Sequence, residues 1–134
     1  MGMEVLPLDG RVLGTLAQRL RQGALVALVA DRDLSRSGID VEFFKGTARM
    51  PAGPALLALK TQAPLITAFV SYTENGIHID FKHVVLPSAG EESAKVREIV
   101  QMTAQHFEDG ISQTPQDWHM LQRIWVDGDF KERE

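Results

Sequence analysis

The chain has 134 residues, of which 14 are Lys or Arg and 18 are Asp or Glu, so its formal net charge is −4 with His neutral. This length suits a single domain, and 44% hydrophobic with 24% charged residues is typical of a globular protein. The absence of Cys excludes a disulfide framework, a thiolate zinc site and a Cys nucleophile. The acidic balance argues against nucleic-acid binding, because proteins that neutralise phosphates usually carry a basic face.

No segment predicts export or membrane insertion. The first residues lack the basic and apolar regions of a signal peptide, and the longest apolar run, Ala24 to Ala30, is far shorter than a bilayer span. We therefore expect a cytoplasmic protein. No repeat or linker divides the chain, so residues 1–126 are predicted to form one α/β domain, followed by a charged tail over residues 127–134.

The first half of the chain alternates between strand and helix signals. Residues 3–8 are strand-like, and apolar residues at helical spacing predict a helix over 11–22 that ends at Gly23. Residues 24–30 are continuously apolar, which predicts a strand buried on both faces at the centre of a parallel sheet. A charged loop, 31–38, follows at the carboxyl end of this strand, where α/β proteins place their functional groups.

The later elements are predicted from turn residues and periodicity. Asn75-Gly76 is typical of a tight hairpin turn, with one wet face on the strand that follows it. The elements expected after the charged loop are a strand at 39–44, a helix at 55–60 with Pro51 and Pro54 in its first turn, strands at 63–72 and 77–81, a long amphipathic helix from about Gly90 to Gly110, and a short helix from Thr114 that holds Trp118 and Trp125. The two tryptophans are expected to contact the core in preference to lipid.

Two polar segments are candidate binding sites. The loop Asp31-Arg32-Asp33 combines two carboxylates with a guanidinium, which can orient a general base or hold a phosphate. A solvated loop between two elements is the alternative. The segment 44–49 places Lys45, Thr47 and Arg49 around a glycine ahead of a predicted helix, where an anion can bind. Its spacing alone is not specific.

Longer blocks resemble one known family. These blocks are ADRDLSRSGIDVEFF at 30–44, ARMPAGPALLA at 48–58, and WHMLQ at 118–122 with Trp125 after it. In this order they closely resemble the bacterial lipid A biosynthesis acyltransferase family, particularly its actinobacterial phosphatidylinositol mannoside acyltransferases. The resemblance runs from about Gly2 to Trp125. It implies an α/β domain that transfers a fatty acyl chain from acyl-CoA to a sugar hydroxyl of a membrane glycolipid.

The family's catalytic signature, His-x-x-x-x-Asp, is missing from this chain. In that motif the histidine takes the proton of the acceptor hydroxyl. The four histidines here are His78, His83, His106 and His119, and none is followed by Asp five positions later. The chain therefore resembles the C-terminal half of such an enzyme, with a partial mixed sheet and flanking helices. A truncated reading frame, a split gene product and an expressed fragment all remain open, and we expect little activity from the chain alone.

The resemblance also implies roles for residues of this half. Glu42 is the expected carboxylate partner of the absent histidine, and a solvent-facing charge on an edge strand is the alternative. The expected substrate-binding residues are Asp31, Arg32, Asp33, Arg36 and Arg49. Their arginines would lie near the phosphates of acyl-CoA or of the glycolipid, and the two aspartates would hold Arg32 and Arg49. Acyl-CoA is a co-substrate, and no cofactor or metal is expected.

Three further expectations concern partners and rival functions. Unpaired strand edges recruit partners, so we expect a homo-oligomer or association with the missing half. Arginines on the helix 11–22 suit peripheral contact with anionic lipid on the inner face of the plasma membrane. A non-catalytic module that binds lipid or CoA, or that acts as a scaffold, is the second hypothesis. A metal-dependent hydrolase using Asp31, Asp33 and Glu42 is the third, and the intervening Arg32 opposes it.

Overall fold

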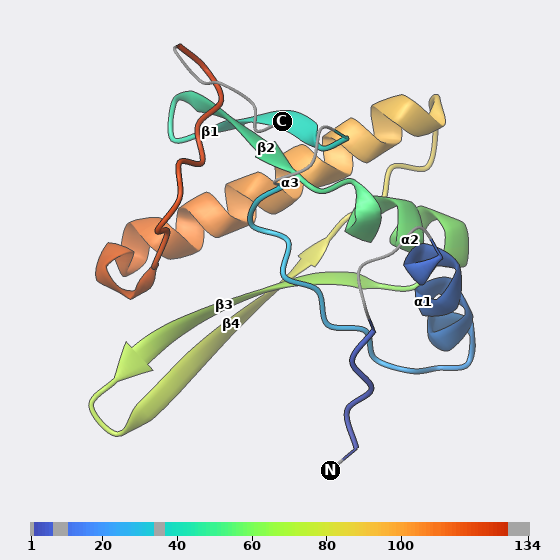
Figure 1. Ribbon diagram of the computed structural model, residues 1–134, viewed down its shortest axis with the longest axis horizontal. Coiled ribbons are helices and arrows are strands. Elements are labelled where there is room, and N and C mark those ends of the chain that lie inside the picture. Colours follow the sequence, from blue (N-terminus) through green and yellow to red (C-terminus); the bar gives the residue numbers. More distant parts are fainter. Residues whose placement is uncertain (1, 7–10, 34–36, 129–134) are drawn as a thin grey trace.

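A computed structural model describes residues 2–6, 11–33 and 37–128 of the chain. In chain order its elements are α1 (Val12–Arg21), β1 (Ile39–Phe43), β2 (Gly46–Met50), α2 (Gly53–Thr61), β3 (Leu65–Thr73), β4 (Gly76–Val84), α3 (Glu92–Gln113) and the 3-10 turn η1 (Pro115–Asp117). The strands form two separate antiparallel hairpins, β1–β2 and β3–β4 (Figure 1). The predicted α/β class with flanking helices is confirmed.

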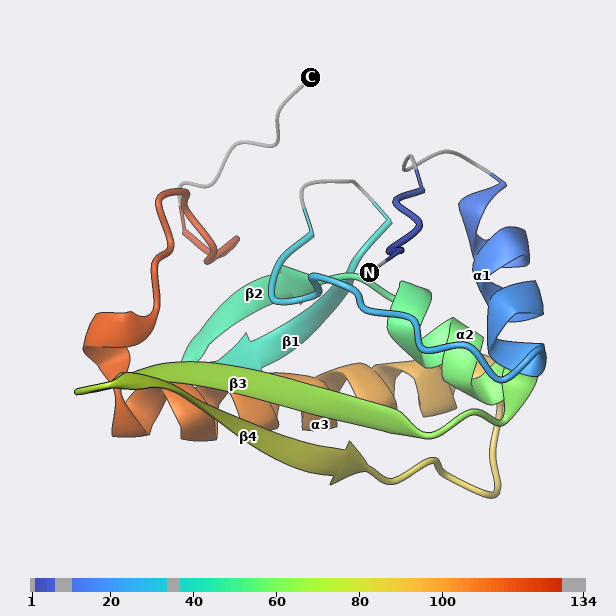
Figure 2. The ribbon, with the colours of Figure 1, turned by 90° about the horizontal axis from the view of Figure 1, so that it is seen from below.

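Helix α3 is the centre of the packing and contacts both hairpins. Its apolar residues recur at the spacing of one helix face, and the buried ones include Val96, Ile99, Val100, Ala104 and Ile111. The inner face of β1–β2 lies against this stripe and buries Val41, Phe43, Ala48 and Met50. Figure 2 shows α3 running along one side of β3–β4, with α1 and α2 together at one end of the molecule. The core therefore lies between α3 and β1–β2.

The C-terminal segment fastens the β1–β2 hairpin. Phe44 and Lys45 form its two-residue turn with positive φ angles of 48° and 63°. Residues other than glycine rarely adopt this backbone conformation. The Phe44 N–H donates to Glu108 Oε2 over 3.0 Å, and the Trp125 indole N–H donates to the Phe43 carbonyl over 3.0 Å. Gly46 permits this contact, because a Cβ there would overlap the Trp125 ring. Contacts from α3 and from the C-terminal segment thus hold a strained turn.

The predicted final helix is wrong beyond its first turn. Its start is placed correctly, but regular structure ends with η1 and Trp118 is already extended. The Val126 N–H donates to the Thr47 carbonyl over 2.7 Å, so the backbone pairs with the edge of β2 and does not continue as a helix. The two tryptophans make the expected core contact, since the Trp118 ring meets that of Phe43 edge-on at 6.0 Å.

The apolar run 24–30 does not form the predicted central strand. It contains no regular structure, and Leu25 and Val29 are 96% and 92% exposed. A strand at the centre of a parallel sheet takes hydrogen bonds from a neighbour on each side. The described residues offer it no such neighbour, because both of their sheets are two-stranded hairpins. The strand-like reading of residues 3–8 is also wrong for 3–6, and residues 7–8 lie outside the described ranges.

The β3–β4 hairpin forms where predicted, but its apolar face points away from the core. Thr67 and Lys82 are cross-strand partners, and both make hydrogen bonds to side chains of α3. Since side chains alternate along a strand, the neighbouring positions face outward. These are the exposed residues Ile66, Val70, Tyr72, Ile77, Ile79 and Phe81. The alternation itself was predicted correctly, and its apolar side is the exposed one.

Candidate functional site

The outer face of β1–β2 gathers several of the predicted site residues. Val41 and Phe43 of β1 point into the core, so Asp40 and Glu42 between them are exposed. The register places Asp40 opposite Arg49 and Glu42 opposite Thr47. The Arg49 guanidinium donates from Nε to Asp40 Oδ1 over 2.8 Å and from Nη2 to Oδ2 over 3.5 Å. An ion pair, a second carboxylate and a hydroxyl therefore share one face.

The charged loop is tied to this face at Asp33. The Asp33 N–H donates to the Arg49 carbonyl over 2.8 Å. Gly38 lies so close to both residues that a Cβ there would overlap the Asp33 and Arg49 side chains. Two of the predicted substrate-binding residues thus come together although they are far apart in sequence. Arg36 lies outside the described residues.

Asp31 and Arg32 differ from their neighbours because their side chains are unpaired. Both are half-buried. Within the described ranges, neither side chain makes a hydrogen bond or an ion pair. The cation of Arg32 is therefore available to an anionic ligand, whereas that of Arg49 already has Asp40 as a partner. The sequence analysis did not select Asp40. The strand register, which places Asp40 opposite Arg49, identifies it.

Glu42 is held in position through its backbone. Its N–H donates to Gln101 Oε1 and its carbonyl accepts from Gln101 Nε2, each over 2.9 Å. This reciprocal pair joins the free edge of β1 to α3 and leaves the Glu42 side chain exposed. Gln101 is a second residue that sequence reasoning missed, and its place on a helix next to the core stripe gave no signal of this contact.

The segment 44–49 does not form the predicted anion cradle at a helix start. It is the turn of β1–β2 followed by β2, and α2 begins only at Gly53. The Thr47 N–H donates to Asp127 Oδ2 over 2.9 Å, so a carboxylate of the chain itself occupies this donor. The prediction failed because the glycine serves the close approach of Trp125 to the turn.

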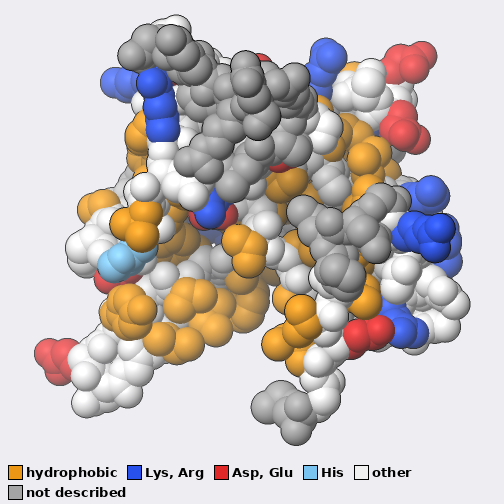
Figure 3. Space-filling model, in the orientation of Figure 1, with side chains coloured by type: hydrophobic (Ala, Val, Ile, Leu, Met, Phe, Trp, Pro, Cys, Tyr) orange, Lys and Arg blue, Asp and Glu red, His pale blue; other side chains and the backbone are white. Residues whose placement is uncertain are grey.

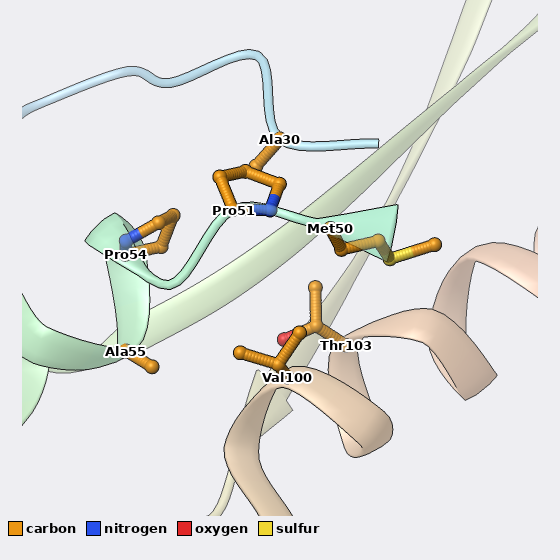
Figure 4. A pocket seen from close by; sticks show the side chains of 7 residues that line it. All are labelled: Ala30, Met50, Pro51, Pro54, Ala55, Val100 and Thr103. Carbon is orange, nitrogen blue, oxygen red and sulfur yellow. The ribbon is translucent and has the colours of Figure 1, made fainter. Parts of the chain in front are cut away.

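A small apolar hollow lies behind the site (Figure 4). It separates Ala30 and the end of β2 from α3, and its walls are Ala30, Met50, Pro51, Pro54, Ala55, Val100 and Thr103. Its volume is about 10 Å³, which is room for a single water molecule at most. The hollow cannot hold an acyl chain.

A second polar cluster lies between α3 and β3–β4. His106 Nδ1 is 3.0 Å from Thr67 Oγ1, and that hydroxyl donates to the Lys82 carbonyl over 3.2 Å. Burial lowers the pKa of His106 and the charge of Lys82 lowers it further, whereas Asp109 and Asp80 oppose this shift. The arrangement ties helix to hairpin and does not pair a nucleophile with a base.

The other three histidines, His78, His83 and His119, are exposed. Among the residues that the structure describes, no three His, Asp or Glu side chains lie together in a way that could hold a metal ion. No helix in the described part of the chain is both long enough and apolar enough to cross a membrane.

Comparison with known proteins identifies the family. A family model described as bacterial lipid A biosynthesis acyltransferase matches residues 1–127. The phosphatidylinositol mannoside acyltransferases of Mycobacterium tuberculosis and Mycolicibacterium smegmatis are each 40% identical to this chain over 129 residues. These alignments cover 94% of this chain but only 40% and 41% of the two relatives, so the chain spans about two fifths of their length. The chain belongs to the bacterial lipid A biosynthesis acyltransferase family.

Proposed function

We propose that this chain is one part of an O-acyltransferase that moves a fatty acyl chain from acyl-CoA to a sugar hydroxyl of a membrane glycolipid. The acceptor is of the phosphatidylinositol mannoside or lipid A type. The observation that carries the proposal is the 40% identity, over 94% of the chain, with phosphatidylinositol mannoside acyltransferases. The family match over residues 1–127 supports the same reaction class.

In this reaction the acceptor oxygen attacks the thioester carbonyl carbon, the carbon–sulfur bond breaks, and CoA leaves as a thiolate. The proton of the acceptor hydroxyl passes to a histidine base. We propose that this histidine comes from polypeptide outside the 134 residues. Glu42 of this chain then lies beside it, where a carboxylate fixes the imidazole tautomer and stabilises its protonated form. The exposed side chain and clamped backbone of Glu42 suit that role.

Arg32 and Arg49 are proposed to serve the phosphates in different ways. Arg32, unpaired among the described residues, binds a phosphate of acyl-CoA or of the glycolipid directly. Arg49 is bound to Asp40 and only 18% of its side chain is exposed, so it shapes the face and contributes less charge. Asp31 and Asp33 orient the loop that carries Arg32, and Arg36 is expected to add a cation from the same loop.

The substrate requires work at a membrane surface, so we propose a peripheral position on the cytoplasmic face of the plasma membrane. Helix α1 carries the arginines that suit this contact. Arg19 donates from Nε and Nη2 to the Glu4 carboxylate, each over 3.0 Å, so the net charge of this surface is smaller than its arginines suggest. Association with a second copy or with the rest of an acyltransferase completes the assembly.

A non-catalytic module that binds lipid or CoA is the second candidate. The observation that favours it is that none of the four histidines has Asp five positions later. On this view the loop with Arg32 keeps its affinity for phosphates, and no acyl transfer takes place in any assembly.

The deciding experiment measures CoA release from acyl-CoA with and without a mannosylated phosphatidylinositol acceptor. The proteins compared are the purified chain, the chain co-expressed with the part of the Mycolicibacterium smegmatis relative that it does not match, and the complete relative as a positive control. We expect turnover only from the second and third samples, and a loss of at least tenfold in kcat for Glu42→Gln in the second.

Two other results would reject the proposal. Turnover by the chain alone would show that the base is within these 134 residues. CoA binding that Arg32→Ala weakens, together with no turnover in the co-expressed sample, would assign the chain to the binding module.

A further inference from the structure

The outer face of β3–β4 is apolar, exposed and free of Lys, Arg, Asp and Glu. It carries the six large side chains Ile66, Val70, Tyr72, Ile77, Ile79 and Phe81, which are between 39% and 69% exposed. Val70 lies directly opposite Ile79, and Tyr72 lies directly opposite Ile77. Figure 3 shows hydrophobic side chains gathered along this hairpin. Contiguous apolar surface of this kind marks an interaction site.

Within the described residues, the β3–β4 hairpin has a covering layer on one of its two faces only. A two-stranded hairpin is marginally stable in water without a third strand or a packed layer. Here α3 contacts the inner face of the hairpin, and the apolar side chains of the outer face are exposed in the described part of the chain.

The chemistry of the face favours protein over lipid. Proteins that rest on anionic membranes place Lys and Arg beside their apolar side chains, and the outer face of β3–β4 has neither. Helix α1, whose last turn carries Arg19 and Arg21, lies beside α2 and away from the tip of the hairpin (Figure 1). A protein occupant needs no cations, because alternating Ile, Val, Phe and Tyr on a pleated surface pack well against an apolar helix or strand.

The relatives indicate which polypeptide would cover the outer face of β3–β4. The chain aligns with about two fifths of each relative, so more than half of each has no counterpart in the 134 residues. The apolar run 24–30 is a second unpartnered feature, with Leu25 and Val29 almost fully exposed. One polypeptide that supplies both a neighbouring strand and a covering layer satisfies both features together.

We propose that the outer face of β3–β4 is the docking surface for polypeptide homologous to the part of the relatives that this chain does not match. The six apolar side chains become buried in that contact. The inference rests on the proposed function, since it names the partner with which the chain would act.

The test is co-expression of the tagged chain with the unmatched part of the Mycolicibacterium smegmatis relative, followed by purification and light scattering. We expect a one-to-one complex. Ile79→Lys and Phe81→Lys should reduce the recovered partner at least tenfold, because each places a charge at the centre of the contact. Leu121→Lys is the matched control, since Leu121 is 96% exposed and lies outside the hairpin. Circular dichroism of each isolated variant checks that it remains folded.

Equal recovery of the partner by the hairpin variants and the unaltered chain would overturn the inference, as would no recovery by the unaltered chain. A dimer of the isolated chain that the same variants dissociate would assign the face to a second copy, and would also overturn it. Acyl-transfer assays separate the two proposals. A complex without turnover keeps the docking surface and rejects the function, whereas turnover that survives both hairpin substitutions does the reverse.

Discussion

Arg49 and Asp40 lie opposite each other on β2 and β1, and the guanidinium donates from Nε to Asp40 Oδ1 over 2.8 Å. Half of the Asp40 side chain is exposed, at 52%, against 18% for Arg49. The pair therefore stabilises the fold weakly, because solvent screens it. Its larger effect is on the charge of the outer face, where Asp40 neutralises a cation that a phosphate would otherwise meet.

Asp40→Asn should separate these two effects. We expect it to lower the free energy of unfolding by at most about 1 kcal/mol, as for other exposed ion pairs. CoA affinity should rise, because the outer face of β1–β2 loses one negative charge. Urea denaturation and isothermal titration calorimetry measure the two quantities. Arg49→Ala serves as the comparison, and weaker CoA binding by Asp40→Asn would contradict the assignment.

Gly46 and Gly14 are a matched pair of glycines with opposite expected outcomes. A Cβ at Gly46 would overlap the Trp125 ring, whereas a Cβ at Gly14 in α1 meets nothing within 4 Å. Overpacking costs about 1–3 kcal/mol, so Gly46→Ala should destabilise the chain by that amount. Gly14→Ala should stabilise it by up to about 1 kcal/mol through helix propensity. Thermal unfolding of both variants is the measurement, and a neutral Gly46→Ala would show that Trp125 does not clamp the hairpin turn.

Gln101 is expected to act as a positioning residue for Glu42. Gln101→Ala removes both hydrogen bonds to the Glu42 backbone, and the expected loss is about 1–2 kcal/mol. A purely structural role would change stability alone. In the co-expressed enzyme we therefore expect a lower kcat with little change in KM, together with faster hydrogen exchange at the Glu42 amide. An unchanged kcat would restrict Gln101 to holding the strand edge.

The parts of the fold that the sequence predicted are those whose signals are local. The spacing of Val96, Ile99 and Val100 defines α3, and Asn75-Gly76 defines a hairpin turn. Pro54 lies in the first turn of α2 as predicted, whereas Pro51 precedes the helix. The run 24–30 was misplaced because its composition reports a buried environment without saying which polypeptide buries it. The same holds for β3–β4, where alternation gives two faces but not the one that meets α3.

The sequence predicted those residues of the site that can be selected by the chemistry of their side chains. Asp33 and Arg49 were both selected, and the structure brings their backbones together. Asp40 and Gln101 were missed because their importance follows from register and from contact between distant elements. The role proposed for Lys45 and Thr47 in an anion cradle failed for a related reason, since Asp127 takes the Thr47 amide from the far end of the chain.

The stability of the chain should fall as the pH drops below about 6.5, the ordinary pKa of a histidine, and His106 is the cause. Burial and the charge of Lys82 lower the pKa of His106 in the folded chain, against the opposing charges of Asp109 and Asp80. The unfolded chain therefore takes up the proton first, and protonation favours unfolding. The contribution of His106 to the free energy of unfolding is complete above its pKa in the unfolded chain and declines as the pH falls toward its pKa in the folded chain.

Urea denaturation from pH 7.5 to 5.5 should show this decline in the unaltered chain. It should show the same decline in His83→Asn, which is the control because His83 is exposed. His106→Asn should flatten the profile, and an unchanged slope in that variant would assign the pH dependence to another group.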